Sequence, residues 1–464
     1  MADKSSDCGR RVQRGNGMLT TARWREKRAG IIAPDERLPW GGTLALGSQH
    51  VLAMFGATVV APLIMGFDPN LAILFSGIGT LIFFVAVGGR VPSYLGSSFA
   101  FIGPVAAVAG STAAGTFDSA AIPEALGGII VAGVVYAAIG VLVHLTGSGW
   151  IDALMPPLVT GAVVAIIGLN LAGAARDLAA NDPFIAIVTI LAIFVVALFA
   201  GGLLGRLPIL LGTVVGYLAA LLLGGTSVGG RSLLGVDIRG VDFAPVRQAA
   251  WFGMPDFVGP SFSWSAISLI APVAVVLVAE NTGHIKAVSA MTDRDLMPYL
   301  GRGFLGDGLA TIVAGLGGGT GVTTYAENIG VMAVTRVYST LIFVVAAVVA
   351  IVLGLSPKFG ALIGSIPLGV LGGVTTVLFG LIAATGARIW VDNRVDFTRG
   401  VNLFVASVTL IVGAANYTLR FGDFELGGIA IGTFGAIILY QIFKNAPQQR
   451  DFELPADAVS NTRP

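Results

Sequence analysis

The chain of 464 residues is strongly apolar, with 55% hydrophobic and only 11% charged residues and a mean hydropathy of +0.86. A soluble globular domain carries about 25% charged residues, so this composition excludes a soluble fold and predicts a protein embedded in a bilayer. The net charge of +1 says little about partners, and we expect no nucleic-acid partner. A single cysteine, Cys8, excludes an intrachain disulfide and a cysteine-based metal site.

Residues 1–28 are polar and basic. They contain no apolar core of the kind that a cleaved secretory signal needs, so we expect residues 1–38 to form a cytoplasmic tail. Cys8 lies in this tail, and a solvated thiol is its expected state.

Twelve apolar runs follow, each bounded by charge, proline or loop composition. A bilayer core about 30 Å thick needs roughly 20 apolar residues per helix, and these runs approach or reach that length. They comprise residues 42–65, 70–87, 122–145, 154–172, 184–203, 207–223, 264–280, 304–316, 337–355, 366–384, 403–415 and 429–443.

Two further apolar stretches, residues 96–109 and 317–334, are too short and too rich in Gly, Ser and Thr to be continuous helices. Each follows two apolar runs in its own half of the chain. Interrupted segments at matching positions are typical of an inverted-repeat transporter whose site lies near the bilayer midplane. We therefore predict an all-α membrane protein of fourteen transmembrane segments in two inverted repeats.

The predicted boundaries follow from this count. A first repeat of seven segments spans residues 39–223, a polar connecting loop spans 224–263, a second repeat spans 264–445, and a cytoplasmic tail spans 446–464. Seven is odd, so the second repeat runs through the membrane in the opposite direction. With both termini inside, twenty-one of the 27 Lys and Arg residues lie on the inner side, as the positive-inside rule requires.

An ionisable residue in a membrane segment is costly and is a candidate for function. Glu280 ends the seventh apolar run, and His284 follows four residues later, on the same helical face if the helix continues. The two groups could then share a proton or a ligand. The alternative is a helix that stops at the interface after Glu280, with both groups in water.

The interrupted segments carry the other candidates. Glu327 lies in a glycine-rich stretch, and backbone groups freed by a helix break need a cavity, water or ligand to satisfy them. The alternative for Glu327 is a structural cap of a re-entrant loop. In the first half, Ser98 and Phe99 occupy the matching place, and an aromatic face can stack on a flat heterocycle. Ordinary core packing is the alternative for Phe99.

Asp307 lies near the start of the eighth clear run and is expected to be a hydrogen-bond acceptor that ties the two halves of the site together. His50 and His144 are expected to be packing or interface residues, although His50 and Gln49 could line the cavity. Three scattered histidines predict no metal site. No Walker A loop or HExxH motif occurs, so the sequence predicts a protein that is not an enzyme.

A pocket with two carboxylates, a histidine, freed backbone amides and a phenyl ring suits a small, planar, uncharged molecule. Carboxylates accept hydrogen bonds from imide and lactam N–H groups, and backbone N–H groups donate to the carbonyls of such a ligand. A buried carboxylate also suits proton transfer, because burial disfavours its charged form.

Residues 327–336, with the sequence ENIGVMAVTR, resemble the signature of the nucleobase–cation symporter family known as nucleobase–ascorbate transporters, in its uracil-permease form. Residues 279–284 (AENTGH), 94–101 (YLGSSFAF), Gln49-His50 and residues 54–57 (MFGA) match in turn. The similarity runs from about residue 33 to 444. Residues 33–39 (APDERLP) are most similar to the pyrimidine permeases of uracil-degradation operons.

The resemblance implies a fold in which segments three and ten are partly short antiparallel strands. It also implies a core domain, made of segments one to four and eight to eleven, that moves against a gate domain made of the others. It implies that a nucleobase is bound by Glu280, Glu327, Phe99, Ala57, Tyr325 and Ala326. It further implies that Glu280, His284 and Glu327 couple transport to protons. The residues that it implies to support the site structurally are Asp307, Ser98, Gln49, His50 and Asn328.

Two departures bear on substrate choice. Xanthine-type members usually have Gln at the position of Glu327, so an acid there favours pyrimidines. The pair Asn281-Thr282 replaces a commoner His-Ile pair.

We therefore expect uracil import by proton symport across the bacterial inner membrane, with no cofactor other than the proton gradient. Thymine or another pyrimidine is an alternative cargo. The relatives also suggest a homodimer formed through the gate domain. The rival hypotheses are a xanthine or purine permease of the same fold and a passive nucleobase facilitator.

Overall fold

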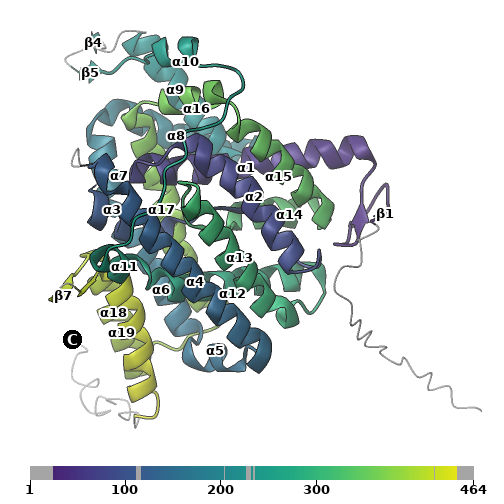
Figure 1. Ribbon diagram of the computed structural model, residues 1–464, viewed down its shortest axis with the longest axis vertical. Coiled ribbons are helices and arrows are strands. Elements are labelled where there is room, and N and C mark those ends of the chain that lie inside the picture. Colours follow the sequence, from purple (N-terminus) through teal and green to yellow (C-terminus); the bar gives the residue numbers. More distant parts are fainter. Residues whose placement is uncertain are drawn as a thin grey trace, which may run out of the picture.

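The computed structural model describes residues 24–110, 117–202, 204–225, 231–233, 236–422 and 424–446. Most of the predicted terminal tails, including Cys8, lies outside the described residues. The described chain is mostly helical, and its helices pack into one body (Figure 1).

The elements before the polar connecting loop alternate long helices with short helical turns. They are β1 (Arg25–Glu26), β2 (Glu36–Arg37), α1 (Trp40–Met65), α2 (Pro69–Ala86), β3 (Leu95–Ser97), η1 (Phe99–Phe101), α3 (Ile102–Ala109), η2 (Ser119–Ala121), α4 (Ile122–Thr146), α5 (Gly149–Leu154), α6 (Pro157–Asn170), α7 (Ala172–Ala180), α8 (Pro183–Phe199), η3 (Leu204–Arg206) and α9 (Pro208–Gly224).

The remaining elements begin with a small hairpin in the connecting loop. They are β4 (Arg231–Leu233), β5 (Val236–Ile238), α10 (Ala244–Gln248), α11 (Trp264–Ile270), α12 (Val273–Thr292), η4 (Met297–Tyr299), α13 (Leu300–Leu316), β6 (Val322–Thr324), α14 (Ala326–Thr335), α15 (Thr340–Gly354), α16 (Pro357–Gly364), α17 (Leu368–Asp392), α18 (Gly400–Ala414), β7 (Leu419–Phe421), β8 (Phe424–Leu426) and α19 (Gly428–Phe443).

Six helical stretches of the described chain are long and apolar enough to cross a membrane. A seventh is added if α15 and α16, which meet at a bend of 82°, are counted as one broken span. Five shorter apolar helices accompany them: Phe99–Ala109, Pro183–Phe199, Pro208–Gly224, Gly400–Ala414 and Gly428–Phe443. The protein is thus a mostly helical membrane protein with several apolar spans, as the composition predicts.

One group of helices packs around α2 and α13. Helix α13 lies along α4 and α2, and α15 lies along α2 and α1 (Figure 1). Glycines allow this close approach. A Cβ atom at Gly140 would lie 2.4 Å from the backbone nitrogen of Leu305, and one at Gly308 would lie 2.5 Å from that of Ala137.

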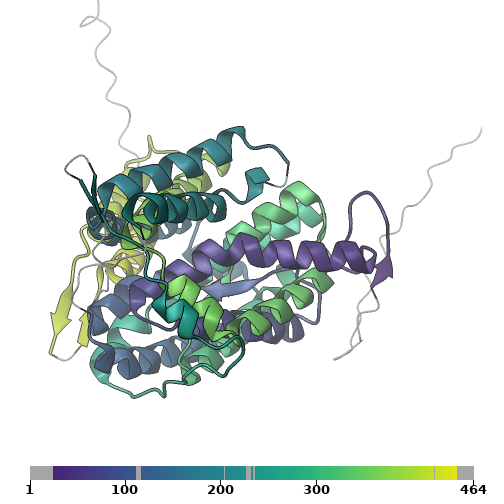
Figure 2. The ribbon, with the colours of Figure 1, turned by 90° about the horizontal axis from the view of Figure 1, so that it is seen from above.

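A second group of helices packs around α17, which contacts α6, α7 and α8, while α18 packs on α19 and α6. Glycine again permits the contact, because a Cβ atom at Gly168 of α6 would lie 2.3 Å from the carbonyl oxygen of Phe379. Seen from above, α1 runs across the molecule between other helices (Figure 2). The two groups meet where α1 contacts α9 and α17 and where α12 contacts α6 and α19.

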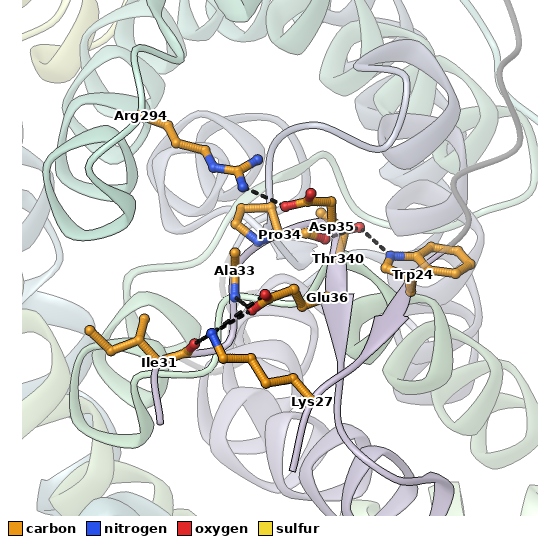
Figure 3. A network of polar contacts seen from close by, with 9 residues as sticks. All are labelled: Trp24, Lys27, Ile31, Ala33, Pro34, Asp35, Glu36, Arg294 and Thr340. Carbon is orange, nitrogen blue, oxygen red and sulfur yellow. Dashed lines mark hydrogen bonds and ion pairs between the residues drawn. The ribbon is translucent and has the colours of Figure 1, made fainter. Parts of the chain in front are cut away.

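A folded segment precedes α1, although the sequence predicted only a tail there. Its strands β1 and β2 pair in parallel, and Ile32 is fully buried and bridges to Val337. The polar contacts of this segment join Trp24 to Thr340, Lys27 to Glu36 and Asp35 to Arg294 (Figure 3).

Candidate functional site

The two interrupted segments meet as a pair of short strands. Strands β3 and β6 are antiparallel, with Leu95 opposite Thr324 and Ser97 opposite Val322. This is the strand pairing that the resemblance implied. Each strand leads into a short helix, since β3 is followed by η1 and α3, and β6 by α14. The first N–H groups of a helix have no acceptor within it, so each helix start offers donors to a ligand.

The two acidic candidates come from neighbouring elements. Glu280 lies within α12, which continues to Thr292, so the alternative of a helix stop after Glu280 is wrong. His284 consequently lies one turn further along the same face. Glu327 lies in the first turn of α14. Each of these three side chains is partly buried.

The carboxyl groups of Glu280 and Glu327 lie close enough to interact electrostatically, so the structure brings them together. Oε2 of Glu280 is buried and has no hydrogen-bond partner in the described part of the chain. Burying an unpaired carboxylate is costly, and two adjacent carboxylates repel one another. The pair is therefore suited to binding a proton or an N–H donor.

Tyr325 directly precedes α14, and its ring lies against Gly96 of β3. Its hydroxyl donates to the carbonyl of Ser97 at 2.8 Å and accepts from Thr58 Oγ1 at 3.2 Å. The ring fits because residue 96 is glycine. A Cβ atom there would lie 2.5 Å from the Tyr325 ring. The tyrosine thus locks α14 onto β3 and α1.

The predicted aromatic residue Phe99 opens η1 and is 9% exposed. Its ring meets that of Phe379 on α17 edge-on, with ring centroids 5.7 Å apart. Phe379 was not a candidate in the sequence, where it is one phenylalanine of 26. Ser98 caps η1 by accepting from the backbone N–H of Ala100. Ala57 is buried in the core, while Ala326 is exposed.

Asn281, which sequence reasoning treated only as a departure from relatives, is a hydrogen-bonding centre. Its Nδ2 donates to Asp307 on α13 and to the hydroxyl of Tyr136 on α4. Its Oδ1 accepts from the hydroxyl of Thr324 on β6. Asp307 therefore acts as an acceptor that joins α12 to α13. Its other oxygen, Oδ1, is buried without a partner among the described residues.

The remaining predicted residues are Asn328 on α14 and Gln49 and His50 on α1. Asn328 Nδ2 bonds the Nδ1 atom of His50 at 3.0 Å and donates to the His50 carbonyl at 3.1 Å. His50 also packs on Phe343, with ring centroids 4.7 Å apart. These contacts place His50 in the packing between α1, α14 and α15. Gln49 is buried, and its Nε2 has no partner in the described chain.

A small cavity lies between the two helix groups. It has a volume of about 20 Å³, close to the size of one water molecule, and it is lined by residues of α3, α12, α6 and the start of α19, among them Gly103, Val276, Asn170 and Ile429. The described residues hold no cluster of three or more His, Cys, Asp or Glu side chains that could bind a metal.

The chain matches the family model described as "Permease family" (Xan_ur_permease) over residues 41–421. It is 56% identical over 414 residues to the "Putative pyrimidine permease RutG" of Escherichia coli K12, a match that covers 89% of this chain and 91% of that protein. It is 41% identical over 436 residues to the uracil permease of Bacillus caldolyticus, covering 90% of this chain and 96% of that one.

Solved structures of low sequence identity share the fold. The murine Solute Carrier 26 family member A9 anion transporter, in its inward-facing state, matches with a TM-score of 0.62 at 13% identity, covering 87% of this chain and 69% of that chain. The transmembrane domain of the cyanobacterial bicarbonate transporter BicA matches with a TM-score of 0.56 at 15% identity, covering 86% and 96%.

Proposed function

The chain belongs to this permease family, and on that premise we propose that it imports uracil, or a close pyrimidine relative, together with a proton. The observation that carries the proposal is the meeting of Glu280 and Glu327 beside the starts of two short helices. The pyrimidine and uracil permeases that the chain resembles support the choice of cargo.

The site chemistry matches an uncharged pyrimidine. Uracil offers two N–H donors and two carbonyl acceptors on a flat ring. Glu280 and Glu327 accept from the N–H groups, and the backbone N–H groups at the start of α14, with those at the start of η1 that Ser98 does not cap, donate to the carbonyls. Phe99 opens η1 and gives the ring an aromatic surface on which to stack.

Proton coupling follows from the repulsion between the two carboxyl groups. A proton bound by either Glu280 or Glu327 removes that repulsion, and an uncharged cargo adds no compensating charge of its own. Proton and cargo therefore bind most favourably together. His284 lies one turn from Glu280 and takes part in the same exchange.

Alternating access needs two bodies that move past one another. In our proposal the helices around α2 and α13 are the core domain, which carries the cargo, and those around α17 are the gate domain. The small cavity and the Phe99–Phe379 contact lie between them. The proposal also includes fourteen segments in two inverted repeats, both termini in the cytoplasm of a bacterium, and pairing of two copies through the gate domain.

The test is uptake of labelled uracil into vesicles that contain the purified protein and an imposed proton gradient. Glu280→Gln and Glu327→Gln should each abolish proton-driven uptake, while the exposed control Glu26→Gln should leave it intact. Thermal unfolding checks that the variants fold. Near-normal uptake by both site variants would remove the assignment. Competition by thymine and xanthine ranks the cargo, and uptake that persists without a proton gradient but never exceeds equilibrium would indicate a passive facilitator.

A further inference from the structure

A continuous chain of side-chain hydrogen bonds connects His284 to Asp307. It runs from Nδ1 of His284 to Thr324 Oγ1 at 2.8 Å, from Thr324 to Asn281, and from Asn281 to Asp307. Asn281 is 1% exposed and Thr324 is also 1% exposed, so water does not compete for these bonds. The direction of each bond can be worked out from the chemistry of the groups.

Asn281 sets the direction at one end. Its Nδ2 faces two oxygens, Oδ2 of Asp307 and the hydroxyl of Tyr136. The Tyr136 hydroxyl donates its own hydrogen to the carbonyl of Leu277 at 3.3 Å, so toward Asn281 it can only accept. The Tyr136 hydroxyl therefore requires an N–H donor, Asp307 accepts from the same Nδ2, and Oδ1 of Asn281 must point toward β6.

The orientation of Asn281 determines which group donates between Thr324 and His284. Oδ1 of Asn281 has no hydrogen, so the Thr324 hydroxyl donates to it. Only the lone pairs of Thr324 Oγ1 are then left for His284, and Nδ1 of the imidazole must carry a hydrogen. The backbone carbonyl of Thr324 also lies near the ring, and a carbonyl can only accept.

We propose that Asn281 and Thr324 are positioning residues that hold neutral His284 as its Nδ1–H tautomer and leave Nε2 as the nitrogen that takes up and releases protons. This inference rests on the proposed function. Nε2 has no hydrogen-bond partner among the described residues, and His284 is partly buried, so this nitrogen is open to the site.

The groups around this chain of hydrogen bonds fit the assignment. Glu280 lies one turn before His284 and interacts electrostatically with Glu327, Asp307 and Tyr136. The amide of Asn281 does not titrate, so protons do not pass along the chain from His284 to Asp307. Proton exchange at His284 is thereby kept separate from Asp307.

The decisive measurement is the nitrogen-15 NMR spectrum of protein labelled at histidine, which distinguishes a protonated from a bare ring nitrogen. The chain has three histidines, and spectra of His144→Gln and His50→Gln identify the signals of His284. At a pH where the ring is neutral, we expect a protonated Nδ1 and a bare Nε2 in the unaltered protein. A bare Nδ1 would overturn the proposal.

Variants connect the tautomer to transport. Thr324→Val removes the hydroxyl with little change in shape, so Nδ1–H should no longer be the dominant form. Uracil uptake at saturating concentration should fall about tenfold, as expected from the loss of one hydrogen bond. Thr324→Ser should restore the Nδ1–H tautomer and the uracil uptake. The matched control Thr311→Val also removes a hydroxyl that bonds β6, at Val322, and should leave the tautomer unchanged.

An unchanged tautomer and unchanged uptake in Thr324→Val would contradict the assignment. If Thr324→Val does not fold, the spectrum of the unaltered protein still decides the matter. An unaltered protein with the expected tautomer but no uracil uptake would support the positioning role and refute the proposed function.

Discussion

Replacing Gly96 by alanine should displace the Tyr325 ring and so reduce uracil uptake. The added Cβ atom would lie 2.5 Å from the Tyr325 ring and 2.7 Å from Thr58 Oγ1, whereas carbon atoms in contact lie about 3.5–4.0 Å apart. The ring would have to move by about 1 Å, although its hydroxyl is held by Ser97 and Thr58. Such overpacking typically costs about 1–3 kcal/mol in free energy of unfolding.

Function should suffer more than stability, because Tyr325 directly precedes the helix that carries Glu327. A displacement of about 1 Å in a site can cost about a hundredfold in rate. Uptake of labelled uracil and thermal unfolding with and without uracil measure the two effects. Gly330→Ala in α14 is the matched control, since its Cβ atom would meet nothing within 4 Å. Normal uptake and stability in Gly96→Ala would refute the reasoning.

Two further predictions concern other parts of the chain. Partial burial is the largest single influence and raises the pKa of Asp35, but the hydrogen bond and charge of Arg294, a backbone hydrogen bond and the charge of Arg25 together outweigh it and hold this pKa below its ordinary value of 3.8. The stabilisation is therefore present above about pH 3.8 and lost as the pH falls through the lower, folded-state pKa. Asp35→Asn should lower the free energy of unfolding in neutral buffer by no more than about 1 kcal/mol, and its stability should match that of the unaltered protein in strong acid. Phe379→Ala should change the maximal rate of uracil uptake more than the affinity for uracil, because its ring contacts Phe99 across the two helix groups. The maximal rate and the half-saturating concentration of uracil measure these two effects. A larger change in the half-saturating concentration would assign Phe379 to binding.

The acidic and interrupted parts of the site could be predicted from the sequence. An acid in an apolar run, or in a glycine-rich break, is costly wherever it lies in a bilayer, so Glu280 and Glu327 stand out without any structure. The matching position of the two breaks in the two halves predicted an inverted repeat with a site near the bilayer midplane, and the resemblance implied the short antiparallel strands that the β3–β6 pair realises.

The helix end after Glu280 could not be predicted in the same way. Asn281-Thr282-Gly283 has the composition of a helix stop, yet α12 continues to Thr292. Its polar side chains are satisfied within the bundle, because Thr282 donates to the carbonyl of Val278 at 2.6 Å and Asn281 bonds residues of α13, α4 and β6. The partners of Asn281 are distant in sequence, so only the packed structure shows that the helix can continue.

The charge balance at the site fits the uncharged cargo of our proposal. The start of each short helix contributes roughly half a positive charge, so η1–α3 and α14 together favour an anion. Here Glu280 and Glu327 face the same region, and with one proton bound the pair carries a single negative charge. The sum is near zero, which matches an uncharged ring.

This balance makes a final prediction. In the double variant Glu280→Gln/Glu327→Gln the two helix starts are left uncompensated, so the site should favour an anion. A pyrimidine carboxylate that does not bind the unaltered protein should then stabilise the double variant in thermal unfolding, more strongly at low salt than at high salt. Uracil should lose this stabilising effect in the same variant. If the carboxylate stabilises neither protein, the helix starts do not control the charge of the cargo.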